Sequence, residues 1–387
     1  MSNVIATIFS FIFVFGILVF VHEFGHFIAA KLVGIRVERF YLGFDMFGLR
    51  LLRFTRGDTE YGIGIVPLGG YVKMAGLIDE SMDAEATGAP DEFMSKNVWQ
   101  KMLAISAGVL MNMVLGFVIY FILSLSAQIS DQPDTFNSAN LPPVVDFVSD
   151  EMPASKAGMV SGAMITEVGG IPIKSWDDLT GIVHESPKEP LKFVWTQGDS
   201  QITKEITPAE MWTLEGWKLK QVGLIGISPA IQDTVLGPLR HPNVIEAVGL
   251  GYSQTVYALR MVFASVRGLV TAQVPFRDMA GPLGIARISG SSGRRVVAAV
   301  REGRGFFEAA GQLFGLIAFF SITLAFINIL PIPALDGGHL AVIILEGIRR
   351  KPLSIKVKLA IQWVGILIIV CLFVILTYND LFRKFPQ

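Results

Sequence analysis

A short stretch near the N-terminus combines the residue types of a metal-dependent hydrolase. His22-Glu23-Phe24-Gly25-His26 fits the pattern H-E-x-x-H. On a helix, positions i and i+4 share one face, so both imidazoles can reach the same metal ion. The Glu23 carboxylate is adjacent, within reach of a metal-bound water as general base. The stretch therefore predicts a catalytic metal site with zinc as the metal.

The alternative for this motif is a helix end with two interfacial histidines and a cap. That alternative is weak here because the motif continues an apolar run, where ionisable groups are costly and by default mark a function. Asp336, which closes another apolar run (313–335), is the expected third ligand. Two imidazoles and one carboxylate leave an open position, as in catalytic zinc sites. His339 is the rival third ligand, or else a residue that supports the ligands or lies at the interface.

The composition excludes an ordinary soluble protein. Hydrophobic residues make up 52% of the 387 residues and charged residues 17%, with a mean hydropathy of +0.54, whereas soluble domains carry about a quarter charged residues. The net charge of -1 gives no reason to expect a nucleic-acid partner. The single cysteine, Cys371, excludes an intrachain disulfide or a thiolate metal cluster.

Four apolar runs are long enough to cross a bilayer, which takes about 20 residues. They are approximately 4–30, 102–127, 313–335 and 359–378. No Lys or Arg precedes the first run, so we expect a retained span rather than a signal peptide. Basic residues concentrate in the loops 31–101 and 349–358, which are therefore predicted to be cytoplasmic. Both termini and the segment 128–310 are then outside, and the metal site is near the cytoplasmic side.

The segments between these runs differ in character. Tyr61–Met74 is rich in β-branched and aromatic residues around Pro-Leu-Gly-Gly, which predicts a membrane-associated β-hairpin. Alternating short strands and turns predict a soluble β-rich domain at 141–230. The periodic segment 244–268 predicts an amphipathic helix on the outer surface, and the Gly- and Arg-rich stretch 290–305 a connector. The expected division is 1–127, 141–230, 231–310 and 311–387.

These residues together resemble the site-2 protease family, in particular its bacterial regulator-of-sigma-E protease branch. The similarity lies in the motif of the first span and in Asn328-Ile-Leu-Pro-Ile-Pro-Ala-Leu-Asp336-Gly-Gly, and it covers most of the chain. The family's Leu-Asp-Gly motif implies that Asp336 is the third zinc ligand. Its Asn before Pro-x-Pro implies that Asn328 hydrogen-bonds the substrate or the transition state.

Other segments extend the resemblance. Glu60–Met74 resembles the family's membrane-reentrant β-loop, which makes Pro67, Gly69 and Gly70 candidate substrate-binding residues, with ordinary turn residues as the equal alternative. The second span reads Gly108-Val-Leu-Met-Asn112 where the family commonly has Gly-Pro-x-x-Asn. Asn112 is interpreted as an asparagine that bridges helices, a common use of this residue in membranes.

Residues 141–230 resemble a single protease-associated PDZ domain, in Ala157-Gly-Met159, the segment 165–170 and the segment 176–179. A PDZ groove can accept an extended peptide as an added strand. Size-dependent gating is the alternative role. The expected fold is a polytopic α-helical membrane protein with four transmembrane helices, a membrane-associated β-hairpin and an inserted extracytoplasmic PDZ-like β-rich domain.

The resemblance implies an intramembrane zinc metalloendopeptidase of the bacterial cytoplasmic membrane, with one catalytic Zn²⁺. Its expected substrates are single-span membrane proteins already trimmed on the outer side, such as anti-sigma factors, in regulated intramembrane proteolysis. The alternative is a non-catalytic membrane adaptor that binds peptide tails through the PDZ-like domain. Glu23 argues against it, because a binding module needs no general base. A metal transporter is a third possibility, disfavoured by the absence of repeated halves.

Overall fold

The computed structural model describes residues 2–44, 50–77, 87–127, 129–130, 141–149, 152–230, 239–275, 279, 281–302 and 306–382. The chain divides into two compact units, each described by itself below. The first comprises residues 1–123, 248–262 and 275–383, and the second residues 124–247, 263–274 and 384–387. Asp336 and the motif His22–His26 both belong to the first unit. The domain boundaries expected from the sequence remain predictions.

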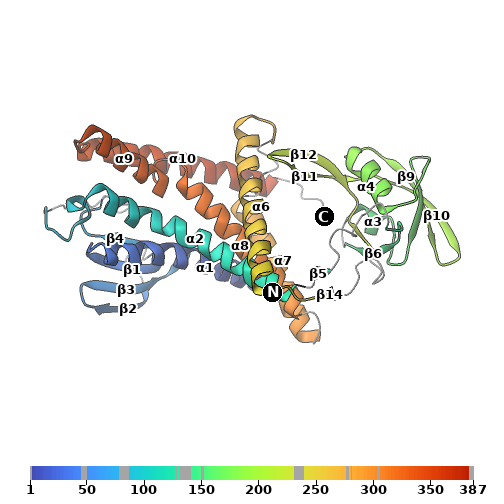
Figure 1. Ribbon diagram of the computed structural model, residues 1–387, viewed down its shortest axis with the longest axis horizontal. Helices are drawn as coiled ribbons and strands as arrows, with labels where there is room; N and C mark the ends of the chain where they lie inside the picture. Colours follow the sequence, from blue (N-terminus) through green and yellow to red (C-terminus); the bar gives the residue numbers. More distant parts are fainter. Residues whose placement is uncertain are drawn as a thin grey trace. The chain divides into compact units, whose positions relative to one another are not determined.

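Four of the described helices are long and apolar enough to cross a membrane. They are α1 (Ser2–Leu32), α2 (Val98–Ser126), α8 (Phe306–Ile329) and α10 (Ile355–Phe382). Each contains one of the four apolar runs or most of it, so the four predicted helices are confirmed. α1, α2 and α8 run beside one another in Figure 1. The short helices η2 (Phe93–Ser95) and α9 (Asp336–Arg349) precede α2 and α10.

The stretch expected to be a connector is helical. It lies largely in α7 (Pro282–Glu302), so the prediction of a connector at 290–305 is wrong. Its small residues serve close helix packing instead: a Cβ at Gly290 would meet Thr7 of α1, and one at Gly293 would meet Ser10. Composition misled here because glycine in an isolated helix is unfavourable, whereas glycine at a helix contact allows close approach.

α7 is also held at its start. Asp380 of α10 is 1% exposed, and its carboxylate accepts hydrogen bonds of 2.9 Å from the backbone N–H groups of Gly281 and Gly284. A carboxylate at a helix start satisfies N–H groups that have no partner within the helix. Residues 281–284 therefore form the anchored start of α7.

A four-stranded sheet packs against α1, as Figure 1 shows. Its strands are β1 (Val37–Phe44), β2 (Arg50–Arg56), β3 (Thr59–Gly64) and β4 (Val66–Met74). The order is β2-β3-β1-β4, with β1 parallel to β3 and antiparallel to β4. The predicted hairpin at 61–74 is therefore wrong: β1 lies between the two strands of that segment. The local pattern identified the strands, but the pairing depends on residues earlier in the chain.

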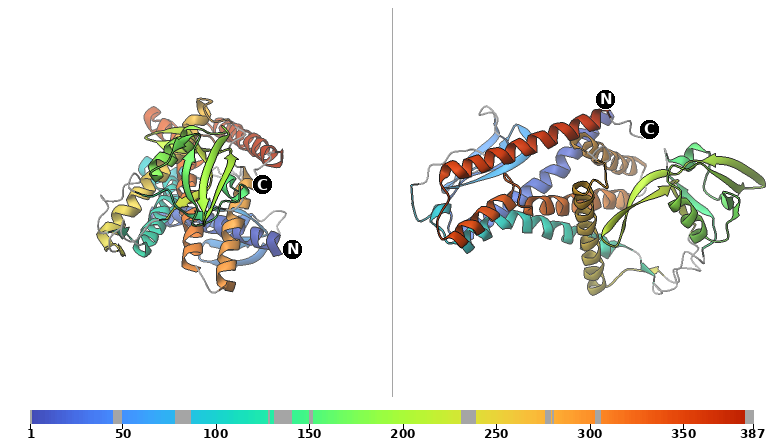
Figure 2. Two further views of the ribbon diagram at one scale, coloured as in Figure 1. Left: turned by 90° about the vertical axis from the view of Figure 1, so that its right-hand side faces the viewer. Right: turned by 90° about the horizontal axis from the view of Figure 1, so that it is seen from above.

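The second unit is β-rich, as expected for 141–230, and is drawn mainly in green in Figures 1 and 2. Its main sheet has the order β10-β9-β7-β8. These strands span Ser200–Ile206, Leu191–Gln197, Met164–Val168 and Ile171–Pro172. Trp195, Phe193 and Ile165 on the sheet and Leu179 on α4 (Trp176–Glu185) are fully or almost fully buried in one core.

Shorter elements complete this unit. They are β5 (Ile129–Ser130), β6 (Val145–Val148), α3 (Pro153–Lys156), β11 (Ala209–Glu215), β12 (Lys218–Leu224), β13 (Ile227–Pro229) and β14 (Leu239–Arg240). The predicted helix at 244–268 is confirmed as α6 (Val244–Val270), which has residues in both units. Its placement on a membrane surface remains a prediction.

Candidate metal centre

Three ligand-type side chains converge from opposite ends of the chain. His22 and His26 lie one turn apart on α1, 8% and 6% exposed, with their Nε2 atoms 3.3 Å apart. Asp336 is the first residue of α9, and its Oδ2 lies 3.1 Å from His22 Nε2 and 3.4 Å from His26 Nε2. The two motifs that the sequence suggested as partners therefore meet at one point.

This donor set fits a zinc ion. Bonds of about 2.0–2.1 Å in a tetrahedral site place neighbouring ligand atoms about 3.3 Å apart, and the three distances here are 3.1, 3.3 and 3.4 Å. Asp336 Oδ2 is buried and has no hydrogen-bond partner among the described residues, a costly state that a cation would relieve. Among the described residues, these three form the one group of three or more that could hold a metal, and His339 is not part of it.

α2 lies behind both histidines. His26 Nδ1 is 2.9 Å from the carbonyl oxygen of Ala104. Because a carbonyl only accepts, Nδ1 carries a proton, and in the neutral ring Nε2 then keeps its lone pair. His22 Nδ1 is 3.3 Å from the amide of Asn112. Gly108 lies between these two α2 positions, and a Cβ there would overlap the His26 ring. The close approach of α2 to the two candidate ligands thus depends on glycine.

Two glycines likewise determine the position of Asp336. The chain turns between α8 and α9, and a Cβ at Gly337 would overlap the carbonyls of Leu330 and Ile329. A Cβ at Gly338 would overlap the carbonyl of Ile332. The glycines after Asp336 therefore let α9 begin directly against the turn, and this brings the carboxylate up to the histidines. An acidic side chain in the first turn of α9 also suits the helix dipole.

A cavity of about 540 Å³ opens beside the three ligand-type residues. Glu23 lines it, and its carboxylate accepts a hydrogen bond from the backbone N–H of Val72 on β4. The cavity wall includes His22, His26, Asp336, Asn328, Gly69, Gly70, Tyr71, Lys73 and His339. The cavity therefore places a carboxylate, an amide and the backbone of an edge strand around the candidate ligands.

Of the predicted substrate-binding residues, Asn328, Gly69 and Gly70 line this cavity. Asn328 lines it, and its Nδ2 is 3.3 Å from His22 Nε2, on the side of the ring that faces Asp336. Gly69 has a φ of +124°, which favours glycine. A Cβ at Gly70 would lie 2.8 Å from the Tyr41 carbonyl oxygen, so this position needs glycine for packing. Pro67 belongs to β4, but its side chain is outside the described part of the chain.

Comparison with known proteins identifies the family. A family model described as Peptidase family M50 matches residues 10–372. The chain belongs to peptidase family M50. It is 28% identical to the zinc metalloprotease RasP of Bacillus licheniformis, over 98% of this chain and 99% of the relative. It is 26% identical to the regulator of sigma-W protease RasP of Bacillus subtilis, again over 98% and 99%.

These findings confirm the resemblance to site-2 proteases, and they confirm a metalloprotease with zinc as cofactor. They favour the enzyme over the non-catalytic adaptor. With its four apolar helices, this M50 peptidase is a multi-pass membrane protein. Among solved structures, the PDZ domain of an SdrC-like protein from Listeria monocytogenes is similar at 24% identity and a TM-score of 0.19, covering 22% of this chain and 84% of that one.

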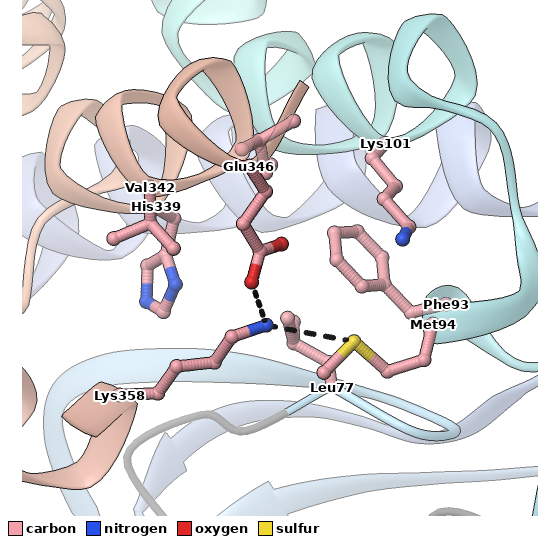
Figure 3. A pocket seen from close by; sticks show the side chains of 9 residues that line it. Leu77, Phe93, Met94, Lys101, His339, Val342, Glu346 and Lys358 are labelled. Atoms are coloured by element: carbon pink, nitrogen blue, oxygen red, sulfur yellow. Dashed lines mark hydrogen bonds and ion pairs between the residues drawn. The ribbon is translucent and has the colours of Figure 1, made fainter. Parts of the chain in front are cut away.

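A second, smaller cavity of about 50 Å³ adjoins the first in this M50 peptidase, and both are lined by Leu77 and His339. Figure 3 shows the ion pair inside it, where Lys358 of α10 lies 2.7 Å from Glu346 of α9. The Glu346 carboxylate also accepts a hydrogen bond of 2.7 Å from the backbone of Leu353. This pair ties the start of α10 to α9, so it supports the helix that carries Asp336.

The sheet that supplies β4 is held by a buried tyrosine. Tyr41 of β1 is fully buried, and its hydroxyl donates a 2.7 Å hydrogen bond to Glu60 of β3. That bond, together with Arg53 and Arg50, holds the pKa of Glu60 below its usual value. Burial and the bond to Glu60 raise the pKa of Tyr41 to about 12. Tyr41 also stacks on Tyr71 at 5.4 Å, so β1 and β4 are joined beside the cavity.

The sequence did not predict the contact of Asn112 with His22. Asn112 contacts the Nδ1 edge of the His22 ring and is not among the residues that line the cavity. One signal was available. Ala104, Gly108 and Asn112 are spaced by four residues and therefore lie on one face of α2. That face is the one that contacts both histidines.

Proposed function

We propose that this M50 peptidase hydrolyses peptide bonds within or near the transmembrane segments of membrane proteins. In this proposal His22, His26 and Asp336 hold one zinc ion, and Glu23 is the general base. The observation that carries it is the convergence of three donor atoms within 3.4 Å of one another beside a cavity that also holds Glu23. Catalytic zinc sites have this combination of three protein ligands and an accessible position.

Zinc bound there supplies Lewis acidity, which polarises the scissile carbonyl and lowers the pKa of a water molecule toward 7. Glu23 accepts the proton of the attacking water and passes it to the leaving amine. The Val72 N–H orients the Glu23 carboxylate. Asn328 projects its amide toward the same space and is positioned to donate to the oxygen that becomes negative in the transition state.

A transmembrane helix has to unwind before its backbone can reach these groups, because each helical carbonyl is hydrogen-bonded within the helix. In the proposal the unwound segment adds to β4 as a further strand. β4 is the edge of its sheet and lines the cavity from Gly69 to Met74. Gly69, Gly70 and Pro67 would then shape the strand that receives the substrate. Ordinary structural roles are the alternative for each of them.

The proposed substrates are single-span proteins of the anti-sigma-factor type, shortened on the outer side before this cut. The name of the Bacillus subtilis relative, regulator of sigma-W protease, supports this class. In the proposed orientation, in the bacterial cytoplasmic membrane, the termini and the β-rich region 141–230 are extracytoplasmic and the metal centre is near the cytoplasmic side. The PDZ-like region would screen substrates by tail or by size.

Metal analysis of the purified full chain tests the proposal directly. We expect one zinc per chain in the parent and in Glu23→Gln, and loss of zinc in His22→Ala and Asp336→Ala. All three variants should fail to cleave a single-span reporter protein in vesicles. Zinc retained by both ligand variants would overturn the site, and cleavage by Glu23→Gln would overturn the role of the base.

The proposed screening of substrates by the region 141–230 needs a separate test. Deleting residues 141–230 should leave zinc content intact and allow cleavage of reporters that still carry their outer domain. If the deletion variant instead lost cleavage of an already shortened reporter while still binding zinc, screening by this region would be the wrong account.

A further inference from the structure

Asn112 is a buried polar residue that the proposed mechanism does not use. It is fully buried on α2, and the hydroxyl of Ser321 donates a 2.8 Å hydrogen bond to its backbone carbonyl. Its Nδ2 lies 3.3 Å from His22 Nδ1, and its Oδ1 has no hydrogen-bond partner in the described part of the chain. Among the described residues, the contact with His22 is therefore the one hydrogen-bonding contact of this amide side chain.

The direction of that hydrogen bond follows from the role of His22. A neutral imidazole carries its proton on one nitrogen and a lone pair on the other. His22 Nε2 faces Asp336 and His26, so this nitrogen must keep the lone pair if it is to bind a metal. The proton is then on Nδ1, and Nδ1 needs an acceptor. Of the two ends of the Asn112 amide, the oxygen meets that need and the NH₂ group does not.

His26 has the same arrangement with an acceptor whose identity is unambiguous. Its Nδ1 contacts the backbone carbonyl of Ala104, and its Nε2 faces Asp336. Ala104 and Asn112 stand two helical turns apart on the same face of α2. Turning the Asn112 amide over about its last side-chain bond would bring Oδ1 to His22, so that this helix would offer one acceptor to each histidine. Among the described residues, no hydrogen bond of Oδ1 opposes this turn.

We infer that Asn112 is a positioning residue of the metal centre, whose Oδ1 accepts the Nδ1–H of His22 and fixes the tautomer and ring orientation that zinc binding requires. This inference rests on the proposed function, because it assigns a role toward the zinc held by His22. Acceptors behind metal-binding histidines commonly contribute about 10–100-fold to metal affinity. The bridging role suggested by the sequence becomes, in this inference, a specific contact with the ligand.

Zinc affinity of the full chain in detergent, measured by competition with a chelator, tests the inference. Asn112→Leu has nearly the same shape without an acceptor and should bind zinc about 10–100-fold more weakly. Asn112→Asp keeps an acceptor oxygen and should retain the parent's affinity or exceed it. Ser124→Ala is the matched control, a buried polar residue farther along α2, and should not change the affinity.

The rescue by aspartate separates positioning from packing, since Asp and Leu both alter the site but only Asp accepts a hydrogen bond. Parent-like affinity in Asn112→Leu, or equal weakening in Asn112→Asp and Asn112→Leu, would overturn the inference. If Asn112→Leu failed to fold, a weakened zinc affinity of Asn112→Asp would by itself overturn the inference. Zinc retained by His22→Ala would instead overturn the proposed function, so the two failures are distinguishable.

Discussion

The candidate metal centre of the first unit and the helix starts of the second use the same residue types in different ways. At the start of α4, Ser175 and Asp178 cap each other's backbone N–H groups, three residues apart. At the start of α6, Asn243 and Glu246 do the same. At the metal centre, by contrast, the partners of His22 are Asn112, Asn328 and Asp336, which come from three other helical segments or their ends.

The difference explains where substitutions should matter. A capping pair satisfies itself within one turn, and the pair at the start of α6 is exposed to water, which can replace a lost bond. A buried polar group without its partner has no such replacement. Polar residues of the metal centre should therefore change function by orders of magnitude, and those at the exposed helix starts should change stability slightly. Four substitutions test this contrast.

Glu23→Gln should have the largest effect. The amide is similar in shape but cannot take up a proton, so cleavage of a single-span reporter should fall by about 10²–10⁴-fold. The zinc content should stay at the parent's level, because Glu23 is not one of the three ligand-type residues. Measuring both on the same preparation is decisive, and substantial residual cleavage would mean that another group is the base.

Asn328→Ala should come next. Loss of a donor to the transition state typically costs about 10²–10³-fold in rate, with zinc affinity unchanged because Asn328 faces the cavity side of His22. Single-turnover cleavage rates and chelator competition separate the two quantities. A weakened zinc affinity with an equal loss of activity would place Asn328 in a supporting role and remove the difference between the two asparagines around His22.

Gly108→Ala should weaken zinc binding by about 10–100-fold, the range for disturbed ligand support. The added methyl would overlap the His26 ring and push it away from Asp336. Gly16→Ala on α1 is the control, because a Cβ there meets no atom within 4 Å. Equal zinc affinities of the two variants would show that α2 can shift without disturbing the ligands.

Glu246→Gln should have the smallest effect, visible as a pH dependence. The hydrogen bond from Arg240, followed by that from the Asn243 backbone, lowers the pKa of Glu246 to about 2. The stabilisation of the folded state by the ionised Glu246 is therefore complete above the ordinary pKa of 4.5 and is lost as the pH falls toward 2. The parent's unfolding temperature should exceed the variant's by less than about 4 °C at pH 7, and the gap should shrink near pH 3. If the difference in unfolding temperature did not change with pH, it would come from packing and not from the charge of Glu246.

The parts predicted well from sequence were those encoded locally. Four apolar runs gave four helices of spanning length, because hydropathy is a property of consecutive residues. The motif His22–His26 needs one helical turn to bring two imidazoles together. The parts predicted wrongly depended on distant neighbours. The pairing of β3 with β1 and the helical state of α7 are both set by segments that no local window contains.

Residue types and spacing alone determined that this protein has apolar helices, a motif typical of metal binding and a distant carboxylate suited to complete it. Only the tertiary structure decided that Asp336 Oδ2 lies 3.1 Å from His22 Nε2 and that Glu23 faces β4. It also decided that Asn328 contacts His22 at Nε2 and Asn112 contacts it at Nδ1. The reason is physical. Residue types state what each group can bind, whereas the packing of α1, α2 and α9 through glycine contacts determines which groups come within bonding distance.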